Sequence, residues 1–292
     1  MLQHTESQQP EFLTTREVAD LLRVKERKVY DLAAADEIPH RRITGKLLFP
    51  AAEIRAWIDG AGEPALRERP NVVAGSHDPL LDWAIKASGS GLATLCNGSR
   101  DGLKQFSSGA AALAGIHLPD GTEWNIPAVE GMRLTNSVLI AWATRKRGLL
   151  LSPETTGLGS VADLKGKRVA LRQPGAGAAV LFSQLLAKAG LSERDLACTK
   201  NHALTEVDAA ASVAGGEADA ALGIEAMAKQ FNLTFLPLVD ERFDLLIDRK
   251  SFFSKPVQTL FNFISTTDFQ DKAESLGGYN LKDLGSVRWL SP

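Results

Sequence analysis

Residues 12–58 carry the strongest structural signal in the chain: FLTTREVADLLRVKERKVYDLAAADEIPHRRITGKLLFPAAEIRAWI. Thr14 or Thr15, followed by Glu17, is typical of a helix start, because the hydroxyl and the carboxylate each bond to a backbone N–H that has no partner within the helix. Apolar residues with helical spacing follow and predict one buried face. These residues are Val18, Leu21 and Leu22.

A second short helix is predicted for residues 25–35, after a tight break at Val24. Val29 and Leu32 face inward in this helix, and its outer face is mainly basic. Two short helices joined by a turn, the second with a basic outer face, form a helix-turn-helix, in which the second helix enters the major groove of DNA. We expect contacts to base edges or phosphates from Lys25, Arg27, Lys28 and Tyr30.

The rest of this stretch predicts a wing and a closing helix. Pro39 ends the second helix, because the residue before a proline is pushed out of the helical conformation. Residues 40–49 alternate around Thr44-Gly45-Lys46, which suggests a two-stranded wing, and Pro50 opens a last helix that includes Trp57. The wing residues expected to hold the DNA backbone are Arg41, Arg42 and Lys46.

The order and spacing of these residues resemble the excisionase-like branch of the MerR-type winged helix-turn-helix family. The resemblance implies a DNA-binding domain at residues 11–59, with a Gly- and Pro-containing linker at residues 60–70. A three-helix protein-interaction module is the alternative. The matching residues are Leu13-Thr14, Glu17-Val18-Ala19, Leu22, Val24, Val29-Tyr30, Ile38-Pro39, Gly45, Phe49 and Trp57.

Length and charge limit the possible classes of protein. The chain has 292 residues, enough for two or three domains, and its net charge of -2 excludes a protein that is basic overall. Seven basic residues stand against four acidic ones between Arg23 and Lys46. This surplus is modest, so we expect a homodimer that binds two half-sites of a double-stranded DNA operator.

Neither secretion nor membrane insertion is indicated. The N-terminal residues are polar and lack the apolar core of a signal peptide, and no run of eighteen apolar residues occurs. Cys96 and Cys198 are far apart and show no metal-binding spacing. We therefore expect a cytoplasmic protein in which both thiols are reduced and buried.

Residues 71–292 alternate short apolar strands with helices, the pattern of a parallel sheet covered by helices. Residues 71–140 plus a C-terminal segment predict one α/β lobe, and residues 155–240 predict a second. Met132–Thr144 is expected to be a long strand leaving the first lobe, with a turn at residues 145–148. The strands expected near the return crossing are Thr234–Leu238 and Phe243–Ile247.

Two α/β lobes joined by crossing strands describe a two-lobed periplasmic-binding-protein-like fold. Five stretches resemble the domain of this superfamily that occurs fused to helix-turn-helix modules. Related stand-alone domains bind molybdate and tungstate, so the resemblance implies one of these oxyanions or a small organic anion as effector, and no cofactor. The stretches are AGIHLPDGTEWNIP (114–127), VADLKGKRVALRQPGAG (161–177), GGEADAALGIEAMA (215–228), LTFLPLVDERFDLLI (233–247) and LGGYNLKDLG (276–285).

Candidate ligand contacts lie in the loops after the predicted strands, because ligands bind at the carboxyl ends of parallel strands. The loop 172–177 enters a helix whose free N–H groups suit an anion, although a plain strand-to-helix turn is the alternative. Relatives usually have a GSGTR-like turn here, and its replacement by GAGAA leaves room for a larger or less polar ligand. The candidates are Ser76, His77, Ser99, Arg100, Arg172, Gly175, Ala176, Gly177, Asn201, His202 and Glu225.

Two further polar residues close to these loops are assigned other roles. Asp78 is expected to cap the helix that follows it, and His117 to have a structural role. The sequence has no nucleophile elbow, no paired zinc-binding histidines and no phosphate loop with lysine. We therefore predict a ligand-responsive transcriptional regulator that is not an enzyme. The alternatives are a cytoplasmic solute-binding protein whose helix-turn-helix contacts another protein, and an enzyme on the same scaffold.

Overall fold

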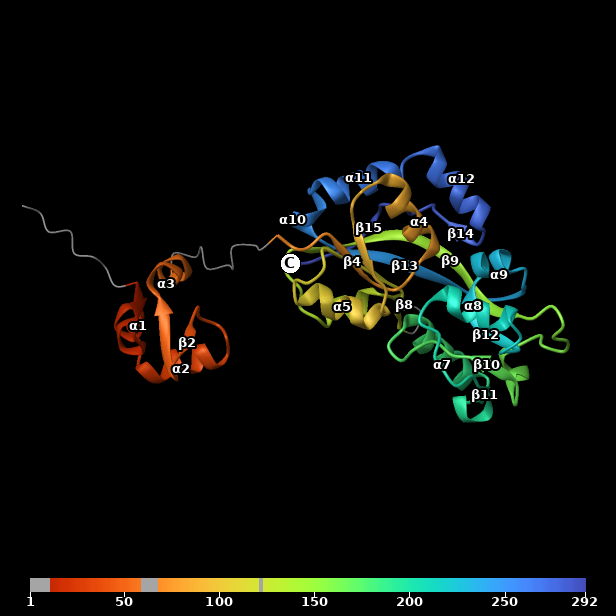
Figure 1. The fold of residues 1–292 in the computed structure, drawn as a ribbon, viewed down its shortest axis with the longest axis horizontal. Helices are drawn as coiled ribbons and strands as arrows, with labels where there is room; N and C mark the ends of the chain where they lie inside the picture. The colour runs from red at the N-terminus through yellow and green to blue at the C-terminus, as the bar shows by residue number, and fades with distance from the viewer. Residues whose placement is uncertain (1–10, 59–67, 121–122) are drawn as a thin grey trace, which may run out of the picture. The chain divides into compact units, whose positions relative to one another are not determined.

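The computed structural model describes residues 11–58, 68–120 and 123–292 (Figure 1). The chain divides into two compact units, residues 1–68 and residues 69–292. Most of the linker predicted at residues 60–70 lies outside the described residues. Among the residues described, no helix combines the length and the apolar character needed to span a membrane.

In the smaller unit, the described residues 11–58 form three helices and a three-stranded antiparallel sheet. The helix α1 begins with a capping box, in which Thr14 Oγ1 accepts from Glu17 N at 3.3 Å and Glu17 Oε2 accepts from Thr14 N at 2.7 Å. The helices are α1 (Thr15–Leu22), α2 (Glu26–Ala34) and α3 (Ala51–Ala56), and the sheet order is β1 (Phe12–Leu13), β3 (Lys46–Pro50), β2 (Arg41–Ile43).

The core of this unit confirms most of the predicted buried positions but not Leu21. Leu21 is 49% exposed, whereas Val18 and Ala19 are buried and Leu22 packs partly against them. Successive residues of a helix are separated by about 100° around its axis. Val18, Ala19 and Leu22 therefore share one face, and Leu21 falls at its edge. The other fully or nearly fully buried side chains are Val29, Ile38, Phe49 and Ile54.

The wing is a hairpin closed by a two-residue turn. Ile43 pairs with Lys46, and the residues between them, Thr44 and Gly45, have φ values of 48° and 81°. Positive φ at both central residues is the geometry of a type I′ turn, whose twist matches that of the flanking strands. The turn therefore fixes the register of the wing.

The larger unit is built on one sheet with two long central strands, β9 (Ser137–Leu151) and β13 (Thr234–Asp248), each of 15 residues. They pair antiparallel along their length and run side by side through the whole unit (Figure 1). The strand order is β11-β10-β12-β9-β13-β6-β4-β5. The shorter strands are β4 (Val72–Gly75), β5 (Ala93–Leu95), β6 (Leu113–Ile116), β10 (Arg168–Ala170), β11 (Ala197–Cys198) and β12 (Ala220–Ile224).

Parallel strands form the two ends of the sheet, and each end has its own helices and its own apolar core. The strands β4, β5 and β6 belong to the first lobe, and β10, β11 and β12 to the second. Short strands β14 (Tyr279–Asn280) and β15 (Val287–Leu290) return to pair with β9, and β7 (Pro119–Asp120) pairs with β8 (Glu123–Trp124). The helices are α4 (Pro79–Ser88), α5 (Ser99–Ser107), α6 (Ile126–Glu130), α7 (Gly177–Lys188), α8 (Glu206–Ala214), α9 (Glu225–Phe231), α10 (Arg249–Phe252), α11 (Lys255–Phe263) and α12 (Thr267–Leu276).

The turn predicted at residues 145–148 is wrong. These residues continue β9, and Arg145 and Arg147 are buried on the same face of the strand, with exposed Lys146 between them. The two segments expected near the return crossing are likewise one continuous strand, β13. Charged residues interrupt both apolar runs in the sequence, yet the strands continue because acidic side chains from elsewhere in the fold neutralise the buried arginines.

Candidate functional site

The smaller unit has a groove of about 550 Å³ between its helices and the wing. All seven residues predicted to contact DNA are exposed. Three of them, Tyr30, Arg42 and Lys46, line this groove. Outside it lie Lys25, the N-cap residue of α2, and Arg27 and Lys28 in the first turn of α2. The other lining residues are Thr14, Thr15, Arg16, Glu26, Gly45, Leu47 and Leu48.

Arg41 differs from Arg42, because neighbouring residues of a strand face opposite sides. The Arg41 guanidinium donates to Glu53 Oε1 at 2.8 Å and to the His40 carbonyl at 3.0 Å, so it ties the wing to α3. Glu26 is an acidic residue in the groove that was not among the predicted contacts. The groove therefore combines three cations, Arg16, Arg42 and Lys46, with one acid and one aromatic side chain.

In the larger unit, the N-termini of α5 and α7 meet. Their N-cap residues are Gly98 and Ala176, and neither helix has a side-chain cap. The Arg100 N–H donates to the Gly175 carbonyl at 3.3 Å, and a Cβ built on Gly98 would lie 3.1 Å from Ala176 Cα. Each helix N-terminus carries a partial positive charge, so their meeting point favours an anion.

Two serine hydroxyls, from Ser76 after β4 and Ser99 at the start of α5, lie beside this point. Both residues are buried, and their Oγ atoms are 2.7 Å apart. Ser99 Oγ also accepts a hydrogen bond from the His117 N–H at 3.1 Å. Because only one hydroxyl proton lies between the two oxygens, the pair keeps a second proton that can be donated to a ligand.

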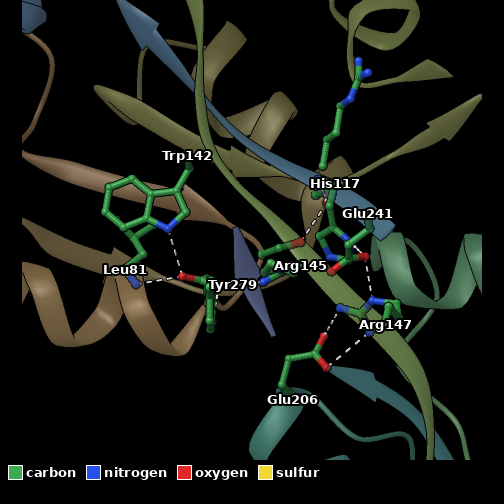
Figure 2. A network of polar contacts seen from close by, with 12 residues as sticks. Leu81, His117, Trp142, Arg145, Arg147, Glu206, Glu241 and Tyr279 are labelled. Carbon is green, nitrogen blue, oxygen red and sulfur yellow. Dashed lines mark hydrogen bonds and ion pairs between the residues drawn. The ribbon is translucent and has the colours of Figure 1, made fainter. Parts of the chain in front are cut away.

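The predicted capping role of Asp78 is confirmed. Its Oδ1 accepts from Leu81 N at 2.7 Å and from Trp142 Nε1 at 3.1 Å. Its Oδ2 accepts from Arg145 Nη1 at 2.7 Å and from the Tyr279 hydroxyl at 2.8 Å. Both oxygens are therefore occupied by protein donors, and Asp78 is the first-lobe end of a buried charge network. Figure 2 shows the network at Arg145, Arg147 and Glu241.

The network continues along the two central strands into the second lobe. Glu241 on β13 accepts from both Arg145 and Arg147 of β9. Arg147 Nη2 also donates to Glu206 Oε1 at 2.9 Å, and Arg172 Nη1 donates to the same oxygen at 2.7 Å. With Asp78, three carboxylates face three guanidinium groups, so the network is balanced in charge.

The pKa values agree with this balance. Burial alone would raise the pKa of Glu206, but Arg147 and Arg172 outweigh burial and lower this pKa to about 2. Burial opposes the ionisation of Glu241 as well, yet Arg145 and Arg147 hold its pKa well below the ordinary value. Both acids are therefore ionised at neutral pH, as compensation of buried arginines requires.

Arg172, predicted as a ligand contact, lies among protein partners. Besides Glu206, its guanidinium donates to the carbonyls of Ala203 at 3.2 Å and Leu204 at 3.0 Å. The Arg100 side chain is exposed, although its backbone joins the two helix starts. Among the predicted ligand residues, Ser76, Ser99, Gly175, Ala176 and Gly177 are those whose side chains or backbone gather at the meeting of α5 and α7.

The remaining candidates lie in other surroundings. His77 is half-buried with no partner for Nδ1, and burial lowers its pKa. Asn201 and His202 are exposed and line a groove of about 560 Å³ with Cys198. Glu225 lines a different groove, together with Lys146 and Lys229. The prediction that both thiols are buried is wrong, because Cys198 is exposed and Cys96 is intermediate.

Four members of the central network, Arg145, Arg147, Glu206 and Glu241, were not predicted from the sequence. A signal existed, since Arg145 and Arg147 have the spacing of one strand face. No group of three or more His, Cys, Asp or Glu side chains able to hold a metal ion occurs within the described part of the chain.

Comparisons with known proteins agree with this architecture. The chain is 25% identical to the uncharacterized protein YvgK of Bacillus subtilis (strain 168) over 300 residues, 94% of this chain and 96% of that protein. It is 37% identical over 79 residues, 27% of this chain and 70% of the other, to an uncharacterized protein from a ferredoxin 2Fe-2S gene 5′ region of Clostridium pasteurianum.

A solved structure shows the same fold. It is a putative phosphate ABC transporter substrate-binding protein with bound phosphate from Clostridium perfringens, with a TM-score of 0.53 and 12% identity over 74% of this chain and 99% of that chain. Residues 12–62 match a helix-turn-helix domain family, and residues 83–265 match the PBP superfamily domain.

These matches confirm the fold class and the domain fusion predicted from the sequence. A helix-turn-helix domain joined to a binding-protein-like domain fits a regulator that binds both DNA and a ligand, and it suggests a protein other than an enzyme. By the match of residues 83–265, the chain belongs to the PBP superfamily domain family, with a helix-turn-helix domain at its N-terminus.

Proposed function

We propose that this protein is a cytoplasmic, homodimeric transcriptional regulator that binds operator DNA and senses a small oxyanion between its two lobes. The observation that supports the sensor role best is the meeting of two helix N-termini without side-chain caps, α5 and α7, beside the buried hydroxyl pair of Ser76 and Ser99. Backbone N–H groups and hydroxyls are donors without a counter-charge, and they suit an anion.

The pairing of the neighbouring arginines with acids supports a small ligand that is held by uncharged donors. Arg145, Arg147 and Arg172 are already paired with acids, so a ligand that recruited them would have to break buried ion pairs. Molybdate, tungstate, sulfate, phosphate and small organic acids are the ligands to compare. The phosphate bound to the C. perfringens protein supports this class of anion.

The ligand test is thermal unfolding of the full chain with each of these anions. An anion at about 100 times its Kd adds about 2.7 kcal/mol, which corresponds to an increase in Tm of about 5–10 °C for a domain of this size. Ser99→Ala is expected to remove most of this increase. Ser90→Ala is the control, because Ser90 is also buried in the first lobe but bonds to the Ile85 carbonyl. An unchanged Tm with every anion would refute the sensor role.

The DNA test is a salt-dependent mobility-shift assay with promoter DNA of the protein's own gene. Arg27→Ala and Lys28→Ala are each expected to weaken binding and to reduce the salt slope by about 1. Lys188→Ala, an exposed substitution on α7, is the control. If neither α2 substitution weakens binding, α2 is not the DNA-contacting helix. Ligand binding without any DNA affinity would favour a solute-binding protein instead.

Closure of the lobes around the anion is the proposed signal. A ligand that binds one arrangement of the lobes more tightly shifts the population toward it. In a homodimer, this shift would change the spacing of the two DNA-binding domains. Sedimentation of the purified protein with and without DNA tests the dimer, and a monomer on DNA would refute this part of the proposal.

A further inference from the structure

His117, at the end of β6, lies between the two halves of the proposed anion site. It is 2% exposed. On the first-lobe side, its backbone N–H donates to Ser99 Oγ at 3.1 Å and so helps to fix the hydroxyl pair. The orientation of Ser99 therefore depends on the position of the residue 117 backbone.

On the second-lobe side, His117 contacts Gly177, the first residue of α7. A Cβ built on Gly177 would overlap the His117 carbonyl oxygen and would lie 2.9 Å from its Nδ1. Neither the carbonyl nor the anchored ring can move away at little cost. Only a glycine at residue 177 allows the N-terminus of α7 to approach this closely.

The ring of His117 is held in place by the charge network. Its Nδ1 is 3.0 Å from Glu241 Oε2, and the ring stacks on Phe243 with centroids 5.9 Å apart. Glu241 is ionised because Arg145 and Arg147 lower its pKa, so Nδ1 carries the proton and donates. Burial lowers the pKa of His117, so the ring is neutral at neutral pH, despite the opposing effect of Glu241.

We propose that His117 is a positioning residue for the anion site. Its backbone N–H fixes Ser99 of the first lobe, and its carbonyl and ring form the surface on which Gly177 of the second lobe packs. The two helix N-termini meet only when Gly177 of α7 packs against His117, and we call this the seating contact. The inference rests on the proposed function for its link to the ligand, but the contact between His117 and Gly177 is made by protein atoms alone. His117 thereby connects the site to the central strands through Glu241.

Gly177→Ala in the full chain tests the seating contact. Alanine is a better helix former than glycine, so the substitution does not weaken α7 itself. We expect amide exchange of the peptide containing Arg100, whose N–H donates to Gly175, to become at least about tenfold faster. Gly159→Ala is the matched control, since its added Cβ would meet nothing closer than Asp163 Oδ2 at 4.0 Å. Unchanged exchange in Gly177→Ala would overturn the proposal.

The link to the ligand is tested by titration with sodium molybdate and sodium phosphate. Gly177→Ala and His117→Ala are each expected to weaken the binding of the stabilising anion by about tenfold or more. His117→Asn, whose amide can donate to Glu241, is expected to recover part of the loss. A purely structural role would lower Tm equally in both His117 variants and leave the affinity of the folded protein unchanged.

The outcomes separate this inference from the proposed function. If the wild type binds either anion and all three variants bind it equally well, His117 does not position the site, and the sensor role stands. If the wild type binds neither anion but Gly177→Ala still accelerates exchange at Arg100, the lobe contact stands and the proposed anion function fails.

Discussion

Arginine residues occupy opposite environments in the two units of this chain. In the smaller unit, Arg27 and Arg42 are exposed, and Arg42 lines a groove with two other cations. In the larger unit, Arg145 and Arg147 are fully buried, and the carboxylates that contact them are shared between them and their neighbours. The first set is available to a charged partner, and the second set is not.

The difference shows that an arginine near a ligand site is evidence for anion binding only when no carboxylate of the protein already pairs with it. Removing a guanidinium from water costs several kcal/mol, and a carboxylate within the protein offsets this cost. Arg172 lies at the carboxyl end of β10, where a ligand contact is expected, yet Glu206 and two carbonyls occupy it. In the larger unit, neutral donors are therefore the better candidates.

The largest expected effect comes from removing the shared acid of the buried arginines. Glu241→Ala leaves Arg145 and Arg147 without their common carboxylate, and breaking a buried pair from one side costs about 3–5 kcal/mol. Urea unfolding of the full chain is expected to show this loss in the transition of the larger unit. If the loss is much smaller, water reaches these arginines and the contrast with the exposed set is weaker than the structure implies.

Asp240→Ala provides the matched control on the neighbouring residue of β13. Asp240 pairs with Lys146 at 2.8 Å, but both side chains are more than half exposed. Surface pairs of this kind contribute little, so no measurable change in the urea transition is expected. Equal losses in the two variants would show that the strand, and not the burial of charge, determines the effect.

A second prediction uses the acid titration of the network. The pKa of Glu206 in the folded protein, about 2, lies below its ordinary value of 4.5. Its ionised form therefore stabilises the fold at pH values above 4.5, and this contribution is lost as the pH falls from 4.5 toward 2. A pKa difference of one between the folded and unfolded states corresponds to about 1.4 kcal/mol, so the full contribution is about 3 kcal/mol.

The measurement compares the free energy of unfolding of the wild type and Glu206→Gln across this range. The difference is expected to be about 3 kcal/mol near pH 6 and to shrink as the pH approaches 2. A difference that stays constant with pH would mean that Glu206 acts through packing or hydrogen bonding alone. The network would then not be a set of compensated charges.

A third prediction separates the two arginines of the wing. Arg42 lines the groove, whereas Arg41 is tied to Glu53 on the other side of the strand. Arg42→Ala is expected to weaken DNA binding by about tenfold at moderate salt and to reduce the salt slope by about 1, with a smaller change for Arg41→Ala. Equal losses in a mobility-shift titration would place both side chains on phosphates and refute the assignment by strand face.

The local signals of the sequence predicted the smaller unit well, because its caps, turns and breaks lie within a few residues of one another. The two lobes were also predictable, since strand and helix alternate clearly. The central strands were not, because the partners that allow charges inside β9 are distant in sequence. Asp78 and Glu241 lie 67 and 96 residues from Arg145, and Glu206 lies 59 residues from Arg147.

The candidate site was predictable to a similar extent. The rule that ligands bind at the carboxyl ends of strands selected Ser76, Ser99 and the loop before α7, which the fold brings together. The same rule selected Asn201 and His202, which turn outward into a separate groove. The end of a strand determines at which edge of the sheet a loop residue lies. The side of the neighbouring helix that this residue faces depends on packing, which the sequence pattern does not show.

The smallest expected effect comes from removing the acid that pairs with an exposed arginine, instead of removing the arginine itself. Arg41 and Glu53 are about half exposed, so Glu53→Ala is expected to change the free energy of unfolding of the smaller unit by no more than about 0.5 kcal/mol. The substitution also releases one guanidinium and removes one negative charge near the DNA. Affinity is therefore expected to rise by about two- to threefold at low salt, with the gain disappearing at high salt because screening weakens it. A loss of affinity would mean that Glu53 holds Arg41 in a position that DNA binding requires, and that even an exposed arginine in this unit is positioned by its acid, as the buried ones are.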